Sequence, residues 1–294
     1  MQQISLMLDF LQANPAWLLT TVFLFSLCIG SFLNVVIYRL PKMMEQSWQQ
    51  EYQEYFHPDK TLAATAVFNL AVPRSACPHC HTQLSVADNI PLLSWLWLRG
   101  RCRYCQAPVS SRYPVVELVT ALLSVLVISI TGPTAYGLLL LLITWALIAL
   151  TFIDIDKMLL PDQITLPLLW LVLLASAVGI GISPTEALIG AAAGYLSLWS
   201  VYWAFKLLTG KEGMGYGDFK LLAIFGALLG WQQLPLIILL SSVVGAVVGS
   251  ISLAIQKKSQ GSAIPFGPYI AAAGFIAMLW GEQISSWYLR SIGL

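Results

Sequence analysis

The chain has 294 residues, of which 58% are hydrophobic and only 10% are charged. Water-soluble domains are about 45–50% apolar and about 25% charged, so this composition excludes an ordinary soluble enzyme and a disordered chain. The formal net charge of +1 excludes a nucleic-acid-binding protein that depends on net charge. The composition instead predicts an all-α polytopic protein of the lipid bilayer.

The first apolar stretch, residues 17–38, predicts a transmembrane helix within a first segment, residues 1–38. It is too long for the core of a signal peptide, and it reaches Arg39 without a small-residue cleavage site. Residues 39–113 then hold eight of the fifteen Lys and Arg, all three His and four of the five Cys. We interpret residues 39–113 as a small soluble insertion in a membrane bundle.

The early part of this insertion, residues 43–70, is rich in aromatic side chains. We expect an amphipathic cytoplasmic helix here, which is either a solvated helix or a surface that docks a substrate. Its aromatic residues include Trp48, Tyr52, Tyr55, Phe56 and His57.

Two CxxC pairs follow: Cys77 with Cys80, and Cys102 with Cys105. Such pairs form turns that direct two thiolates each at one tetrahedral Zn²⁺. Four thiolates close the coordination shell, so the expected metal is structural rather than catalytic. The alternatives are two disulfides, which a reducing cytoplasm disfavours, or free thiols. His79 or His81 could also replace one ligand, but the complete set of four cysteines favours the thiolates.

Seven apolar runs follow the insertion, within residues 114–294, and bring the expected total to about eight transmembrane helices. Turn-forming residues and charges separate the runs. The run at 219–231 is short for a crossing, so we expect it to be tilted, broken or buried among its neighbours. The runs are 115–131, 135–153, 164–181, 186–207, 219–231, 235–255 and 265–282.

The positions of the cations predict the orientation in the membrane. With the insertion in the cytoplasm and eight crossings, fourteen of the fifteen Lys and Arg lie on or near the cytoplasmic side, and both termini are external. Only Arg290 falls outside. The cations after the insertion on the cytoplasmic side are Lys157, Lys206, Lys211, Lys220, Lys257 and Lys258.

Two aspartates lie at the ends of predicted spans. Asp154 closes the third span, and Asp218 opens the sixth after Gly215 and Gly217. Two crossings separate them, so both belong at the cytoplasmic edge, where they would face each other if the third and sixth helices are neighbours. Facing carboxyls share a proton: one activates water and the other hydrogen-bonds the scissile carbonyl, as in aspartic proteases. The alternative for each is a solvated residue at a span end.

Five other acids of this half are expected to be residues at span ends. Asp162 follows Leu160 and Pro161 and could cap the next helix, whereas Glu117 could face the interior of the bundle. The remaining members of this group are Asp156, Glu186 and Glu282.

Several segments, in this order along the chain, together resemble the type IV prepilin leader peptidases. One of them, GxGD at Gly215–Asp218, is a weak pattern alone and is shared with presenilin-like intramembrane proteases; the ordered combination is highly specific. The segments are Gly30–Pro41, the two CxxC pairs, Arg112–Glu117, Ile153–Asp154, Leu160–Asp162 and Gly215–Asp218.

This resemblance implies that Asp154 and Asp218 are the catalytic pair of an aspartic endopeptidase in residues 114–294. It implies that prepilin and pseudopilin precursors are cut after a glycine that follows a short basic leader, at the cytoplasmic face of the inner membrane, for pilus assembly or type II secretion. It further implies N-methylation of the new terminus by S-adenosylmethionine, linked to the insertion at residues 39–113. The insertion contains no glycine-rich cofactor loop, so no methyl-transfer residue is named.

Three other functions are weighed against this one. A transporter would place acids in mid-span along a polar path, whereas the acids here cluster at one face. A scaffold of a pilus or secretion machine would leave the paired aspartates unexplained. A general intramembrane protease of single-span substrates is the nearest enzymatic alternative.

Overall fold

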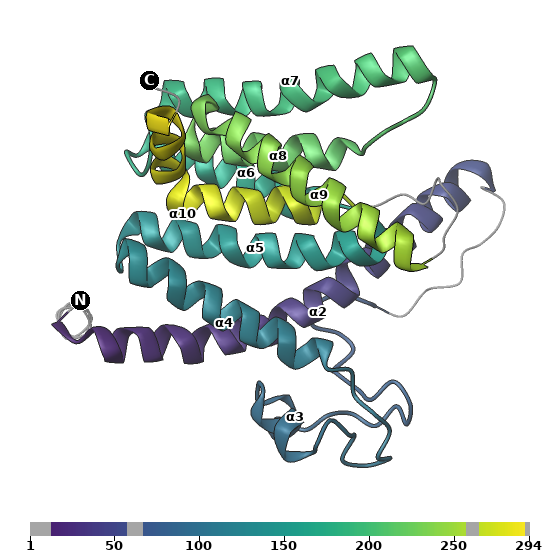
Figure 1. Cartoon of the computed structure of the whole chain (residues 1–294). Helices are drawn as coiled ribbons and strands as arrows, with labels where there is room; N and C mark the ends of the chain where they lie inside the picture. Colours follow the sequence, from purple (N-terminus) through teal and green to yellow (C-terminus); the bar gives the residue numbers. More distant parts are fainter. Residues whose placement is uncertain (1–12, 58–66, 257–264, 292–294) are drawn as a thin grey trace. The chain divides into compact units, whose positions relative to one another are not determined.

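The computed structural model describes residues 13–57, 67–256 and 265–291, and in these residues the regular structure is helical, with two isolated β-bridges (Figure 1). The chain divides into two compact units, Met1–Ser129 and Ile130–Leu294. The long helices are α2 (Pro15–Phe56), α4 (Arg112–Thr131), α5 (Ala135–Lys157), α6 (Asp162–Ala177), α7 (Pro184–Thr209), α8 (Tyr216–Leu229), α9 (Leu234–Gln256) and α10 (Gly267–Ser291). The short helices are η1 (Ala87–Asn89), α3 (Leu93–Trp97) and η2 (Trp231–Gln233).

The predicted all-helical architecture is confirmed. Within the described residues, five segments are long and apolar enough to cross a membrane: α2, α4, α5, α7 and Trp231–Ile251. Helix α6 is apolar but has only 16 residues, and α8 has 14. The predicted break between the runs 235–255 and 265–282, with Lys257 and Lys258, lies outside the described residues.

Helix α2 is longer than the sequence predicted. It runs through Pro41 without interruption for 42 residues, so the first span and the amphipathic helix form one element as far as Phe56. Proline removes one helical hydrogen bond, but the strong helix formers Met, Glu and Gln are frequent in the turns that follow. The prediction of a helix over residues 43–70 was wrong at its end, because residues 67–70 are not helical; residues 58–66 lie outside the description.

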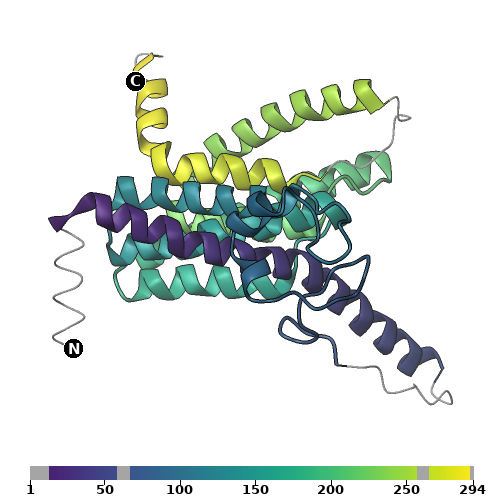
Figure 2. The same cartoon turned by 90° about the horizontal axis from the view of Figure 1, so that it is seen from below.

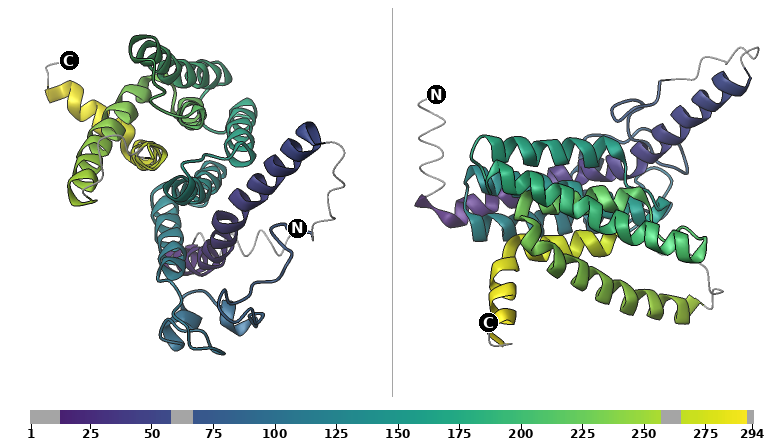
Figure 3. Two further views of the ribbon diagram at one scale, coloured as in Figure 1. Left: turned by 90° about the vertical axis from the view of Figure 1, so that its right-hand side faces the viewer. Right: turned by 90° about the horizontal axis from the view of Figure 1, so that it is seen from above.

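Helices α2 and α4 of the first unit approach each other closely. A Cβ on Gly30 would lie 2.6 Å from the Glu117 Cα, so only glycine fits there. Further along, the Asn34 side-chain amide donates to the Tyr113 carbonyl at 3.1 Å. Since Tyr113 is in the first turn of α4, the part of α2 after Arg39 extends past that end of α4, as Figures 2 and 3 show.

In the second unit, α8 is the central helix. It packs against α6, α7 and α10, and all its residues from Leu221 to Leu228 are buried. Glycines allow the close crossing with α7, where a Cβ on Gly226 would lie 2.0 Å from the Gly190 carbonyl oxygen. The third and sixth predicted spans, α5 and α8, pack little on each other; instead α10 packs on both.

Candidate active site and metal centre

Asp154 lies in the last turn of α5, and its side chain is buried although it is at a helix end. The residue is 5% exposed, and its Oδ2 accepts a hydrogen bond from the Gly267 N–H at 3.0 Å. Gly267 is the first residue of α10, so this N–H has no partner inside its own helix. The amino-terminal end of α10 therefore presents a partial positive charge to the Asp154 carboxyl.

Asp218 lies in the first turn of α8 and is 7% exposed. The backbone of Gly215, which precedes this helix, hydrogen-bonds to its carboxyl group. A carboxylate in the first turn of a helix is favoured by the helix dipole. Both aspartates are thus buried and held by backbone N–H groups, which disagrees with the alternative of solvated span-end residues.

The structure brings the two carboxyl groups together. Their charges lie close enough to interact. Leu160 packs between the two glycines beside them: a Cβ on Gly217 would lie 2.7 Å from the Leu160 Cβ, and a Cβ on Gly267 would lie 3.2 Å from the Leu160 Cδ1. The segment after α5 and the starts of α8 and α10 therefore close around one pair of acids.

An ion pair joins two of these segments. The Lys220 Nζ, in α8, lies 2.6 Å from Oδ1 of Asp162, the first residue of α6. The lysine side chain is 24% exposed and the aspartate side chain 52%. Asp162 therefore links the start of α6 to the helix that carries Asp218. It does not cap α6 as the sequence suggested, because Pro161 is at the N-cap position and no side chain makes a capping hydrogen bond there.

The four cysteines of the insertion form one cluster in the first unit. Cys77, Cys80, Cys102 and Cys105 are all free, and their Sγ atoms lie within 4.8 Å of one another. The Sγ atoms of Cys77 and Cys105 are 3.8 Å apart. A regular tetrahedron with metal–sulfur bonds of about 2.3 Å has sulfur–sulfur edges of about 3.8 Å. This donor set therefore fits a tetrahedral metal and disagrees with a pair of disulfides.

Each cysteine pair lies in a loop of the same design. In the first loop the Cys77 N–H donates to the Thr82 carbonyl at 3.0 Å, and in the second the Cys102 N–H donates to the Ala107 carbonyl at 2.9 Å. An antiparallel bridge closes each loop, and His81 and Gln106 occupy the same left-handed position. This short structural repeat has no counterpart in the sequence beyond the CxxC spacing.

The surroundings of Cys80 favour ligation by this thiol. The Thr82 hydroxyl, helped by the Thr82 N–H, lowers the pKa of the Cys80 thiol to about 6. A thiol with a low pKa is a thiolate at neutral pH, and thiolates are the form that binds metal.

Glu117 connects the cysteine-bearing insertion to α4. Its Oε2 accepts the Leu92 N–H at 2.8 Å, and the carboxyl also hydrogen-bonds to Ser31 of α2. Glu117 is 8% exposed. Glu117 therefore faces the interior of the protein. This was one of the two expectations from the sequence, the other being a residue at a span end.

Comparison with known protein families identifies the two parts of the chain separately. Residues 24–131 match the bacterial peptidase A24 N-terminal domain, and residues 141–250 match the type IV leader peptidase family. A prepilin leader peptidase/N-methyltransferase of Aeromonas hydrophila is 60% identical over 98% of this chain and 99% of its own length. The chain belongs to the type IV leader peptidase family.

Other members of the type IV leader peptidase family are similar over nearly the same length. The prepilin leader peptidase/N-methyltransferase of Pseudomonas aeruginosa is 52% identical over 98% of this chain and 99% of its own. That of Legionella pneumophila is 46% identical over 96% of this chain and 99% of its own. No solved structure matches this member of the family.

The sequence alone did not identify two residues of the site. Gly267 contacts Asp154, and Lys220 pairs with Asp162. The sequence does contain a signal for a helix start at Gly267, which stands between Phe266 and Pro268 at the start of an apolar run. Proline next to the first residue marks a helix start, whose free N–H groups attract carboxylates.

Proposed function

We propose that this chain is a prepilin leader peptidase and N-methyltransferase in which Asp154 and Asp218 form the catalytic pair of residues 114–294. The observation that carries the proposal is the meeting of two buried carboxyl groups at one end of the second unit. Such a pair holds a single proton, because two charged carboxylates repel at short range.

In the proposed reaction the ionised carboxyl takes a proton from a water molecule, which attacks the carbonyl carbon of the scissile peptide bond. The protonated carboxyl hydrogen-bonds the carbonyl oxygen. A proton then passes to the leaving amine, and the C–N bond breaks. Gly215, where an added Cβ would have no neighbour nearer than 3.9 Å, leaves room for an extended substrate backbone beside Asp218, whereas Leu160 fills the space beside Gly217.

We infer eight membrane crossings in a bacterial inner membrane, with the pair at the cytoplasmic side. The five segments suited to crossing and the distribution of Lys and Arg support this topology. The short helix α8 has 14 residues and spans about 21 Å, less than the bilayer core of about 30 Å. Its first turn, with Asp218, would therefore lie inside the lipid boundary, where prepilin and pseudopilin precursors enter the bilayer.

The insertion at residues 39–113 is the proposed methyl-transfer region. Cys77, Cys80, Cys102 and Cys105 would hold a structural Zn²⁺, which would tie together a segment too small for a strong core. S-adenosylmethionine would supply the methyl group, and no residue is assigned to it.

The experiment is incubation of the purified protein in bilayers with a prepilin precursor and S-adenosylmethionine, read by intact-mass spectrometry. The expected product has lost its leader and gained one methyl group. An intact precursor would support a scaffold or transporter, and cleavage within the hydrophobic segment would support a general intramembrane protease. Either result would contradict the proposal.

Gly267→Ala is expected to lower kcat for leader removal by about 10- to 100-fold, because an Ångström-scale displacement of a reacting group has this effect. The new Cβ would lie 2.6 Å from the Asp154 Oδ2 and would displace the carboxyl. Gly281→Ala on the same helix is the control, since its Cβ would meet only the flexible end of Gln233, at 2.9 Å. Equal kcat values for the two variants would contradict a role for the Gly267 contact.

The ion pair between Asp162 and Lys220 is expected to act as one unit. Asp162→Asn and Lys220→Gln should each lower kcat several-fold, with small effects on stability, because exposed ion pairs contribute about 0.2–1 kcal/mol. The double variant should lose no more activity than either single variant. Lys211→Gln, in the loop before α8, is the control. Losses that multiply in the double variant would show that the two residues act independently.

A further inference from the structure

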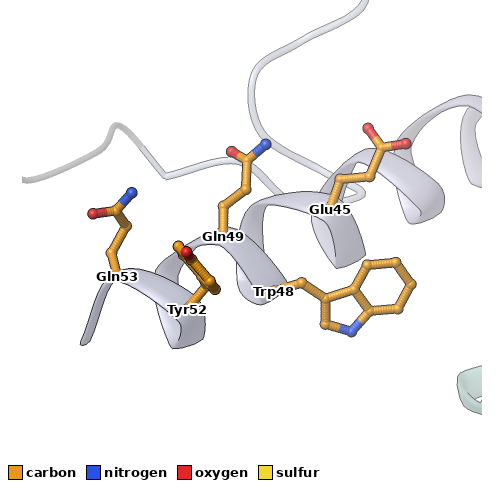
Figure 4. Close-up of a pocket in the computed structure, with 5 residues that line it drawn as sticks. All are labelled: Glu45, Trp48, Gln49, Tyr52 and Gln53. Atoms are coloured by element: carbon orange, nitrogen blue, oxygen red, sulfur yellow. The ribbon is translucent and has the colours of Figure 1, made fainter. Parts of the chain in front are cut away.

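The part of α2 that follows Arg39 presents an acidic-aromatic face, defined by Glu45, Trp48, Gln49, Tyr52 and Gln53. These residues recur every three or four positions and therefore lie on one side of the helix, where they line a shallow pocket of about 290 Å³ (Figure 4). Trp48 is 49% exposed and Tyr52 is 56% exposed. Phe56 continues the aromatic row, with its ring 4.8 Å from that of Tyr52.

The charge of this segment is opposite to that of its surroundings. Residues 43–57 contain Glu45, Glu51 and Glu54 and no Lys or Arg. Residues 67–113 contain five arginines and one acid, Asp88. The positive-inside rule leads one to expect cations on a segment that directly follows a first span. An acidic segment here is repelled by anionic lipid headgroups, so its charge complements a cationic partner instead.

The helix itself contains an example of the contact that such a partner would make. One turn before the face begins, the Lys42 Nζ lies 3.8 Å from the centre of the Tyr38 ring. Aromatic rings attract ammonium and guanidinium groups in this way, and Trp and Tyr are the best rings for it. Trp48 and Tyr52 would offer the same contact to cations from outside the chain, with Glu45 on the same face.

We propose that the acidic-aromatic face binds the Lys- and Arg-bearing N-terminal segment of the precursor that the enzyme cuts. The inference rests on the proposed function. A precursor whose N-terminal segment stays in the cytoplasm ahead of a membrane helix is expected to carry cations there. The helix from Glu45 to Phe56 is about 17 Å long, which suits about five residues of extended peptide.

The test compares steady-state kinetics of leader removal in zwitterionic bilayers. Glu45→Gln, which removes the acid of the acidic-aromatic face, should raise KM for the natural precursor about two- to fivefold and leave kcat unchanged, and higher salt should reduce this difference. Trp48→Leu/Tyr52→Leu should raise KM similarly. Glu282→Gln, which removes one acid from α10, is the matched control and should change neither constant.

A second precursor, in which Gln replaces the Lys and Arg of the leader, tests whether these cations contact the acidic-aromatic face. Wild type and Glu45→Gln should have the same KM for it. An unchanged KM for the natural precursor, or an equal rise in KM for both precursors, would overturn the proposal. So would a difference in KM that occurs only in anionic bilayers, because lipid would then be the partner. Absence of cleavage by the wild type would instead contradict the proposed function.

Discussion

Asp154→Asn and Asp218→Asn are each expected to lower the rate of leader removal by roughly 10⁴-fold, the scale of loss when one member of a catalytic unit is removed. Asparagine has nearly the same size and can still accept the hydrogen bond that Gly267 donates to Asp154. It can neither take up nor share the proton on which the proposed reaction depends. The rate should be measured by intact-mass spectrometry of the precursor in single turnovers.

Asp156→Asn is the matched control for this prediction. Asp156 stands two residues after Asp154 in the same last turn of α5, but it is exposed. Its variant should cleave at close to the wild-type rate and reach the membrane in equal amount. A similar loss in all three variants would mean that helix-end charge, rather than the buried pair, is what cleavage requires.

Removal of the proposed metal should have a large effect on the stability of the insertion and on methylation. Cys77→Ser or Cys102→Ser should reduce zinc from one ion per chain to near zero, because binding energies of about 10–16 kcal/mol depend on a complete set of thiolates. The insertion should then be cut rapidly by protease between residues 67 and 113. Methylation should fall by more than cleavage, since both proposed catalytic aspartates lie in the second unit.

Cys28→Ser is the control for the cysteine variants, because Cys28 is exposed on α2 and is not part of the cluster. It should retain zinc, protease resistance and the wild-type ratio of methylated to unmethylated product. Wild-type protein without zinc, as measured by elemental analysis, would contradict the metal site directly.

The elements of this fold were predictable where hydrophobicity alone decides structure. Each apolar run became a helix, because a chain in lipid must satisfy its backbone hydrogen bonds internally. The short run at 219–231 became α8, a helix whose residues from Leu221 to Leu228 are buried by its neighbours. The four cysteines could be grouped because CxxC spacing determines where two thiolates point.

Features that depend on tertiary packing were not predictable in the same way. The contact of Gly267 with Asp154 joins residues 113 positions apart, and the pair of Lys220 with Asp162 joins residues 58 positions apart. Pro268 marks the helix start at Gly267 but does not indicate which carboxyl that helix start contacts, and the pair of Lys220 with Asp162 has no local pattern. The continuation of α2 through Pro41 was also missed, since proline is a strong local signal for a helix end.

The measurement that tests the central claim most directly is the single-turnover rate of leader removal by the double variant Asp154→Asn/Asp218→Asn, compared with each single variant. If the two carboxyls share one proton and act as one unit, all three proteins should have the same residual rate, because either substitution already disables the pair. Processing by either single variant at close to the wild-type rate would contradict the account.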